Sequence, residues 1–210
     1  MKTKMFLDFD GTLFDTNTLK KKLYNLCVGL GFSSDVITQS YRLECADGLF
    51  SPDGLVRRLA KIKKIDFQIA ADGIKMLTSE SAKYLFDDTI DFLTRLDRNK
   101  FEINLMTLGD LSFQRRKVEN SGLSVYFDNI YYVGKNKWEI MDQYVEKDEL
   151  FIFIDDREDT IYNVAQKYPS SVCLCIKRKD EDRDDPNHRK AGGNITKIKS
   201  LSEALAYIKN

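Results

Sequence analysis

The sequence has little of several residues whose abundance marks particular classes of protein. Three prolines and eleven glycines in 210 residues exclude collagen-like and linker-dominated architectures. No stretch approaches the roughly 18 apolar residues of a membrane-spanning helix, since the longest strongly apolar segment is LFIFI at 150–154. The only histidine, His188, lies in the charged segment 177–194, whose composition predicts a loop. With a single histidine, in a predicted loop, a histidine-based catalytic triad or metal site is not expected.

Charge of one sign is not in excess either. The 33 Lys and Arg residues balance 33 Asp and Glu residues, which argues against a broad basic face for binding nucleic acid. The apolar stretch near the start of the sequence is interrupted at Asp8, so we expect no secretory signal. The sequence therefore predicts a cytoplasmic protein with no nucleic-acid and no membrane partner. It does not indicate the oligomeric state.

Cysteine is sparse, and its spacing does not repeat. The four cysteines are Cys27, Cys45, Cys173 and Cys175. Cys173 and Cys175 lie two apart in an apolar, β-rich stretch, so both side chains should point to one face of a strand. A zinc or redox site would be expected to include a second pair, and none is present. We therefore interpret these two residues as small side chains in a buried strand.

What the sequence does contain is enough apolar material for a core, arranged in an alternating pattern. Hydrophobic residues make up 42% of the chain and aromatic residues 11%. After residue 87, helical and strand patterns alternate. We expect strands at 101–107, 130–133, 150–154 and 172–176, and helices at 88–98, 111–120, 138–146, 158–167 and from about 201. Short apolar strands separated by helices indicate a parallel sheet covered on both faces.

An earlier strand, at residues 4–8, is separated from the others by helical patterns alone. Leu19, Leu23, Leu26 and Leu30 recur at helical spacing, and Ser51-Pro52 is typical of a helix start. The fold class predicted is α/β, a doubly wound, Rossmann-like parallel sheet with an all-helical insertion after the first strand. Residues 1–16 and 88–210 would form the core, and residues 17–87 the insertion.

Carboxylates gather where the predicted strands end. Asp8 and Asp10 follow the first strand, Asp155 and Asp156 follow the strand at 150–154, and Thr107 ends the strand at 101–107. In open parallel sheets, ligands bind beyond the carboxyl ends of the strands. Carboxylates so close together raise one another's pKa unless a cation neutralises them. A hard divalent cation suits them. Mg²⁺ fits best because proteins usually bind it through a few carboxylates together with the phosphate of a substrate.

These segments resemble, in order, the four signatures of the haloacid dehalogenase superfamily (HAD). The segment DFDGT at 8–12 is similar to the DxDGT signature, and Thr107 to the second signature. Lys137, in KWEIM, is similar to the third, and Asp155-Asp156, with Asp159 beyond, to the fourth. The insertion lies where the family places its helical C1 cap. The resemblance covers nearly the whole chain outside the insertion, and its four ordered motifs are specific.

The resemblance implies a role for each residue. Asp8 would be the nucleophile that attacks phosphorus and forms an aspartyl-phosphate. Asp10 would protonate the leaving oxygen and then activate the water that hydrolyses the intermediate. Thr107 would bind the transferring phosphoryl group, helped by the backbone N–H of Leu108, and Lys137 would hold its charge and that of Asp8.

The resemblance also implies a metal site and a function. Asp8, the backbone carbonyl of Asp10, and Asp156 would bind Mg²⁺, with Asp155 assisting directly or through water. Phosphatases of the family have the second Asp of the first signature and dehalogenases lack it, so Asp10 favours phosphoryl chemistry. The implied function is a Mg²⁺-dependent phosphohydrolase that acts on a small phosphorylated metabolite, a phosphomonoester. The cap would exclude water and select this substrate.

Other interpretations stay open. One is a phosphomutase of the same family, which uses the same core. Another is a non-catalytic protein that keeps the fold and binds a phosphorylated ligand without turnover, although such a protein has no need of Asp10. A signalling receiver module also combines Asp, Thr, Lys and an acidic pair, but there the acidic pair follows the first strand. Lys135 competes with Lys137 for the third signature. We prefer Lys137 because it directly precedes the helix-forming segment WEIMDQY.

Overall fold

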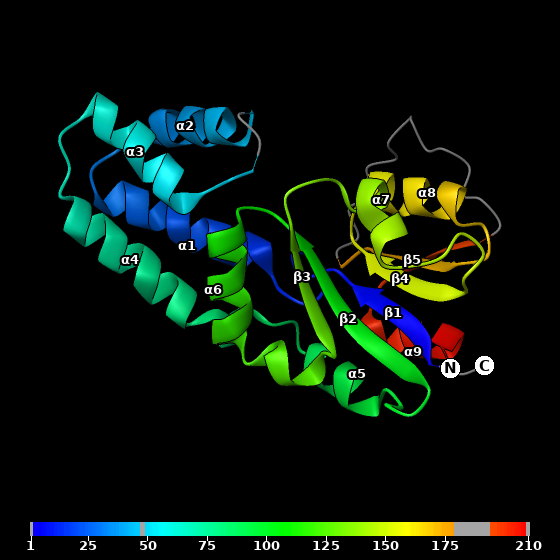
Figure 1. Ribbon diagram of the computed structural model, residues 1–210. Helices are drawn as coiled ribbons and strands as arrows, with labels where there is room; N and C mark the ends of the chain where they lie inside the picture. The colour runs from blue at the N-terminus through cyan, green and yellow to red at the C-terminus, as the bar shows by residue number, and fades with distance from the viewer. Residues whose placement is uncertain (1, 47–48, 179–193, 209–210) are drawn as a thin grey trace.

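The core of the protein is a parallel sheet whose central strand is the first in the chain. The computed structural model describes residues 2–46, 49–178 and 194–208 (Figure 1). Within these residues, six parallel strands lie in the order β3-β2-β1-β4-β5-β6. Their bounds are Thr3–Leu7 (β1), Phe101–Leu108 (β2), Asn129–Val133 (β3), Phe151–Asp155 (β4), Val172–Ile176 (β5) and Ile195–Ile198 (β6). The chain winds from β1 to one edge and then from β4 to the other, so the order reverses beside β1, where such sheets bind ligands.

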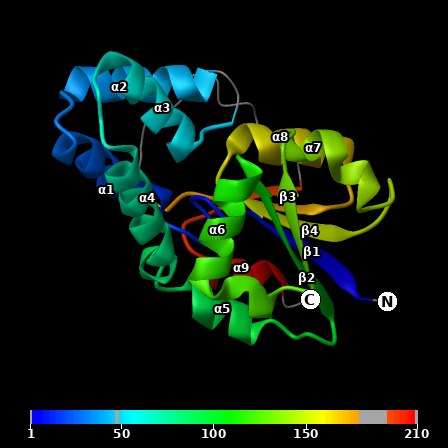
Figure 2. The same ribbon diagram turned by 60° about the vertical axis from the view of Figure 1, so that its left-hand side comes forward.

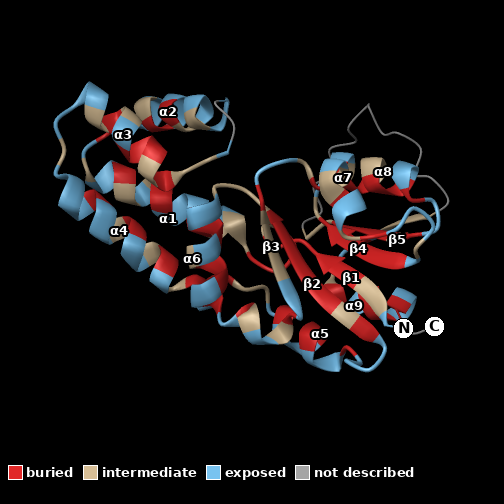
Figure 3. Cartoon of the chain, in the orientation of Figure 1, coloured by how far each residue is buried: buried red, intermediate tan, exposed pale blue. Residues whose placement is uncertain are grey.

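Helices cover both faces of this sheet. On one face lie α5 (Thr89–Arg95), α6 (Leu111–Ser121) and α9 (Leu201–Ile208), and on the other lie α7 (Lys137–Ile140) and α8 (Glu158–Lys167). Along β1, Met5 and Leu7 pack into the first core and Phe6 into the second. Figure 3 shows the strands as largely buried. Burial on both faces explains why strand sequences such as FIFI are continuously apolar instead of alternating.

The segment between β1 and α5 is helical, as the pattern predicted. It forms α1 (Thr16–Gly29), α2 (Ser34–Ala46), α3 (Pro52–Ile62) and α4 (Phe67–Ser79), which share a core of their own. Ser51 is the N-cap of α3, with its side chain accepting a hydrogen bond from the Gly54 N–H (3.3 Å), and Pro52 is the first helical residue. Figures 1 and 2 both show α6 lying between these four helices and the sheet. The helical segment therefore contacts the core in part through α6.

The structure differs from the sequence prediction in two places, and a third prediction lies mostly outside the described residues. The helix predicted at 138–146 is wrong: α7 ends at Ile140, and a short 3₁₀ turn, Met141–Gln143, follows. The chain turns there because the Tyr144 ring packs on Tyr131, with centroids 4.4 Å apart. The edge strand β6 was not predicted, since its four residues carry too weak a pattern. Most of the charged segment 177–194, with His188, lies outside the described residues.

The cysteines behave as the strand pattern predicted. Cys173 and Cys175 lie in the same core and are buried, free thiols. Burial raises the pKa of each thiol to about 11, which keeps both protonated and unreactive at neutral pH. Among the described residues, no helix combines the length and apolar character that crossing a membrane requires.

One ion pair joins four segments near the carboxyl edge of the sheet. The Arg178 guanidinium, after β5, donates to both Asp88 carboxylate oxygens (2.7 Å each) and to the Thr12 carbonyl (3.2 Å). Asp88 also accepts a hydrogen bond from the backbone N–H of Leu201, at the start of α9 (2.8 Å). The two side chains are 13% and 18% exposed, so little solvent screens them.

We therefore expect Arg178→Met to lower the free energy of unfolding by about 2–3 kcal/mol, because it leaves Asp88 partly buried without its counter-ion. Arg95→Met is the matched control, since Arg95 pairs with Asp91 at 51% and 60% exposure and such pairs contribute little. Chemical denaturation at pH 7 measures both values. Equal effects of the two substitutions would contradict this account.

Candidate active site

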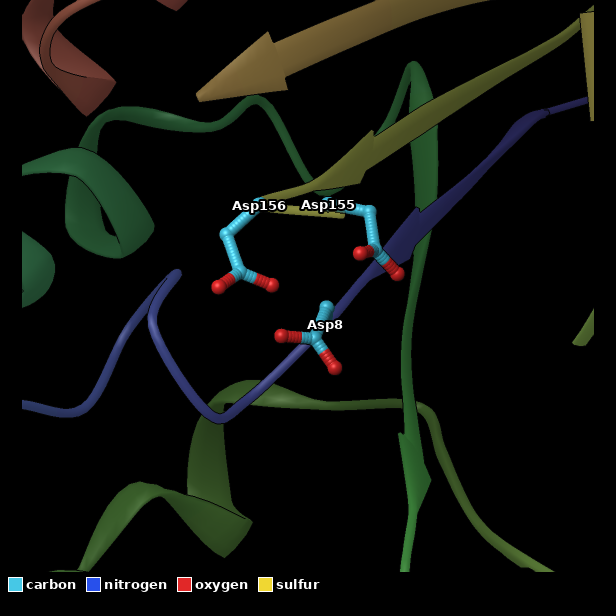
Figure 4. Close-up of side chains that lie close together, drawn as sticks. All are labelled: Asp8, Asp155 and Asp156. Atoms are coloured by element: carbon cyan, nitrogen blue, oxygen red, sulfur yellow. The ribbon is translucent and has the colours of Figure 1, made fainter. Parts of the chain in front are cut away.

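The centre of the site is Asp8, which follows β1 directly. Leu7 pairs with Leu105 of β2 and with Ile154 of β4, so Asp8 emerges between the ends of these two strands. Its backbone N–H donates to the Ile154 carbonyl (2.9 Å), which aligns Asp8 with Asp155. Figure 4 shows the side chains of Asp8, Asp155 and Asp156 directed toward a common space. One carboxylate oxygen from each lies within 4.8 Å of the others.

Lys137 supplies positive charge to this group. It is the first residue of α7, and its side chain is 4% exposed. Its ammonium donates to an Asp8 oxygen and to an Asp155 oxygen, the latter at 2.6 Å. Burial alone would lower the pKa of Lys137, but the charges of Asp155 and Asp8 outweigh it and raise the pKa, so the side chain stays charged. Lys135, the competing candidate, is exposed.

The carboxylates outnumber this ammonium. Burial raises the pKa of Asp8 well above its usual range, despite the opposing charge of Lys137. Burial, and then the charge of Asp155, raise the pKa of Asp156 to about 6. Asp8 Oδ2 is buried and has no hydrogen-bond partner. A cluster of carboxylate oxygens with displaced pKa values and an unpartnered ligand atom fits a hard divalent cation such as Mg²⁺.

The turn after β1 brings Asp156 against the backbone of Gly11. Gly11 has a φ of +82°, and a Cβ there would lie 2.2 Å from Asp156 Oδ2. The turn is closed by the Gly11 N–H, which donates to the Phe14 carbonyl (2.9 Å). Only glycine provides both the left-handed conformation and the room for the carboxylate. This explains the glycine in the DFDGT segment from local structure.

Asp10 lies in a different environment from Asp8. Its carboxylate accepts hydrogen bonds from Thr16 Oγ1 (2.6 Å), Gln114 Nε2 (2.7 Å) and Lys117 Nζ (2.5 and 2.7 Å). Burial alone would raise the pKa of Asp10, but the charge of Lys117 and these hydrogen bonds outweigh it and hold the pKa below its usual range. Asp8 and Asp10 are two residues apart, yet their pKa values move in opposite directions.

Sequence reasoning missed Gln114 and Lys117. Both belong to the buried stripe of α6, which comprises Phe113, Gln114, Lys117, Val118 and Ser121. The signal was present: an amide and an ammonium occupy positions of an otherwise inward-facing helical stripe, where burial is costly unless each group has a partner. Their partner is Asp10, which only the fold brings to this helix.

The remaining predicted residues lie at the end of β2 and beyond β4. Thr107 is fully buried, and its hydroxyl has no hydrogen-bond partner, which suits a group that binds a ligand. Leu108, the last residue of β2, is partly buried. Asp159 lies apart from the carboxylate cluster and pairs with Arg157 (2.6 Å) on the surface. The structure thus brings Lys137 into contact with Asp8 and Asp155, and an Asp156 oxygen lies within 4.8 Å of an oxygen of each. Asp10 and Thr107 lie at the ends of the adjoining strands β1 and β2.

A cavity of about 370 Å³ opens beside these residues. Asp10, Gly11 and Asp156 line its inner side, and Thr16, Asn17 and Lys20 of α1 line the side that the cap contributes. Arg157 and Lys177 also contribute to its wall. The cavity is large enough for a small anionic molecule, and its basic side chains would favour one. The cap therefore meets the core at the site itself.

We expect the affinity for Mg²⁺ to fall as the pH drops below about 6, because Asp156 takes up a proton there and only the carboxylate binds metal. Above that pH Asp156 is ionised and adds no further pH dependence. Below it, each pH unit should weaken binding about tenfold. Isothermal titration calorimetry between pH 5 and 7.5 measures this dependence, and a constant affinity over the whole range would contradict it.

We also expect Asp156→Asn to stabilise the metal-free protein at pH 7. A carboxyl whose folded pKa is raised contributes stability below that pKa and opposes folding above it, so replacing the charge should gain about 1–3 kcal/mol. The same substitution should abolish the stabilisation that Mg²⁺ provides. Thermal unfolding with and without Mg²⁺ measures both effects. Asp159→Asn, at the exposed ion pair, is the matched control and should change neither by much.

Comparison with known proteins agrees with this architecture. No curated protein matches the chain. A haloacid dehalogenase-like hydrolase from Burkholderia xenovorans LB400 has 15% identity over 97% of each chain, with a TM-score of 0.77. L-2-haloacid dehalogenase from Xanthobacter autotrophicus has 14% identity over 100% of this chain and 99% of its own (TM-score 0.69). The magnesium-bound HAD-hydrolase YfnB from Bacillus subtilis has 16% identity with the same coverage (TM-score 0.63).

At these identities the likeness shows a shared fold. The family itself is shown by sequence, because residues 5–161, more than half of the chain, match the family model for haloacid dehalogenase-like hydrolases. This match includes all the residues that form the carboxylate cluster and its lysine. The chain therefore belongs to the haloacid dehalogenase-like hydrolase family.

Proposed function

We propose that this hydrolase is a Mg²⁺-dependent phosphohydrolase that acts on a small phosphomonoester through an aspartyl-phosphate. The observation that carries the proposal is the second carboxylate, Asp10, held at the cavity by three donor side chains. An alkoxide is a poor leaving group and needs a proton from a nearby acid, whereas a halide leaves without one. A built environment for Asp10 thus favours ester cleavage over dehalogenation.

The reaction would proceed in two steps. First, the Asp8 carboxylate attacks phosphorus, the phosphorus–oxygen bond of the ester breaks, and Asp10 gives its proton to the leaving oxygen. Second, water attacks the phosphorus of the aspartyl-phosphate, the bond to Asp8 breaks, and Asp10 takes the proton from the water. The proton that Asp10 gains in one turnover is the one it donates in the next.

The surrounding groups would stabilise the charge that develops. Lys137 would neutralise Asp8 and the phosphoryl oxygens, and the unpartnered Thr107 hydroxyl would donate to one of these oxygens, beside the Leu108 N–H. Asp8, Asp156 and the Asp10 carbonyl, assisted by Asp155, would hold Mg²⁺. When bound, Mg²⁺ would offset the negative charge of the phosphoryl group.

The cap would control access to this chemistry. Its first helix begins at Thr16 and lines the cavity, while Asp53 of α3 pairs with Arg116 of α6 (3.2 Å). A small phosphorylated metabolite would be enclosed between cap and core, with water excluded during the first step. A cytoplasmic location is part of the proposal and is consistent with the free thiols.

The test is phosphate release from 4-nitrophenyl phosphate, with and without Mg²⁺. We expect metal-dependent turnover that falls by at least about 10³-fold in Asp8→Asn, because that variant lacks the nucleophile. Matching thermal unfolding curves would show that the variant is folded. Asp159→Asn, outside the site, should retain the activity.

Three other results would contradict the proposal in different ways. Chloride release from 2-chloropropionate without phosphate release would indicate a dehalogenase. A stable phosphorylated Asp8 that transfers its phosphoryl group to a second substrate more readily than to water would indicate a phosphomutase. Binding of phosphate esters without any turnover would indicate a ligand-binding protein.

A further inference from the structure

Lys117 is a charged side chain enclosed by aromatic rings. The residue is 1% exposed, and its Nζ lies 4.8 Å from the ring centroid of Phe113, 5.3 Å from that of Phe14 and 5.5 Å from that of Phe9. An ammonium is costly to bury, and an apolar residue of similar size would pack into such a cage at lower cost. The presence of a lysine here therefore calls for an explanation beyond packing.

The Lys117 ammonium contacts the carboxylate of Asp10. Lys117 Nζ lies 2.5 and 2.7 Å from the two Asp10 oxygens. The Asp10 side chain still has 23% of its surface exposed, and it lines the cavity. Lys117 thus contacts both carboxylate oxygens from the protein interior, and Thr16, which also lines the cavity, donates to Oδ1 (2.6 Å).

Gln114 fixes the same carboxylate relative to the end of β2. Its side-chain amide donates to Asp10 Oδ2 (2.7 Å) and to the Leu108 carbonyl (3.0 Å). Leu108 follows Thr107, the residue whose free hydroxyl faces no protein partner. Gln114 therefore sets the position of Asp10 against the strand end where a phosphoryl group would bind.

Both residues come from one rigid element. They lie three apart on α6, so their side chains share a face of the helix. The helix is capped by Asp110 and anchored by Phe113 and Val118 in the main core. A well-packed helix limits the rotamers of its inward side chains, which lets it hold a catalytic group in one geometry.

We infer that Lys117 and Gln114 are positioning residues for proton transfer by Asp10. They fix the rotamer of Asp10 so that its carboxyl reaches the leaving oxygen in the first step and the attacking water in the second. This inference rests on the proposed phosphohydrolase function. It predicts that replacing either residue lowers kcat/KM most for the esters whose leaving groups most need a proton.

The test is a series of esters with increasingly poor leaving groups: 4-nitrophenyl, phenyl and benzyl phosphate. The quantity measured is kcat/KM at saturating Mg²⁺, which reports the steps up to formation of the aspartyl-phosphate. For Lys117→Met we expect a loss of about tenfold or less with 4-nitrophenyl phosphate and about 10²-fold or more with benzyl phosphate. The loss should lie in kcat, with KM changed little. Gln114→Leu should show a smaller selectivity in the same direction.

Arg115→Met is the matched control, because Arg115 belongs to the same helix but is exposed and lies over the Tyr132 ring. It should leave all three rates unchanged. Thermal unfolding and Mg²⁺ titration check that each variant is folded. If Lys117→Met does not fold, the comparison is made with Gln114→Leu. An equal loss with all three esters would overturn the positioning role while leaving the phosphohydrolase function in place. Failure of the wild type to release phosphate from any of the three esters would overturn both.

Discussion

Repulsion among carboxylates at the carboxyl edge of the sheet is the interaction on which the arrangement of the site depends. Asp8, Asp155 and Asp156 come from neighbouring strand ends, with one oxygen of each within 4.8 Å of the others. Lys137 contacts two of them and cannot balance all three. The folded chain therefore gathers carboxylates in a buried place. Burial raises the pKa values of Asp8 and Asp156, and the charge of Asp155 raises them further. A cation and an anionic substrate together would relieve this repulsion.

Two carboxylates separated by one residue, Asp8 and Asp10, lie in different surroundings. Asp8 is placed among other carboxylates, with Lys137 as counter-ion, whereas Asp10 turns toward the donors of α6 and the Thr16 hydroxyl. The pKa of Asp8 is raised and that of Asp10 is lowered. These opposite directions reflect different electrostatic environments: Asp8 is buried beside other carboxylates, and Asp10 is paired with Lys117. The Gly11 turn makes the separation possible, since it reverses the chain directly after Asp10.

The sequence predicted the parts of the site that depend on strand ends. Asp8, Thr107 and Asp155 follow apolar runs, and in a parallel sheet such residues meet at one edge whatever the exact register. The contribution of α6 could not be predicted in the same way. Lys117 and Gln114 belong to the site only because they contact Asp10, which is over one hundred residues away in the chain. The helix predicted at 138–146 was wrong for a related reason: packing of Tyr144 overrides the local helical pattern after Ile140. Local patterns describe elements well, and contacts between distant elements poorly.

The helix α6 contacts both the cap and the candidate active site. Arg116 pairs with Asp53 of the cap, while Gln114 and Lys117, on the inward face, donate to Asp10. Asp10 also accepts a hydrogen bond from Thr16, the first residue of the cap's first helix (2.6 Å). The carboxylate is thus shared between an element that is fixed to the sheet and one that belongs to the cap. Asp10 thus links the first helix of the cap to α6, and its carboxylate is the partner that makes burial of the Lys117 ammonium tolerable.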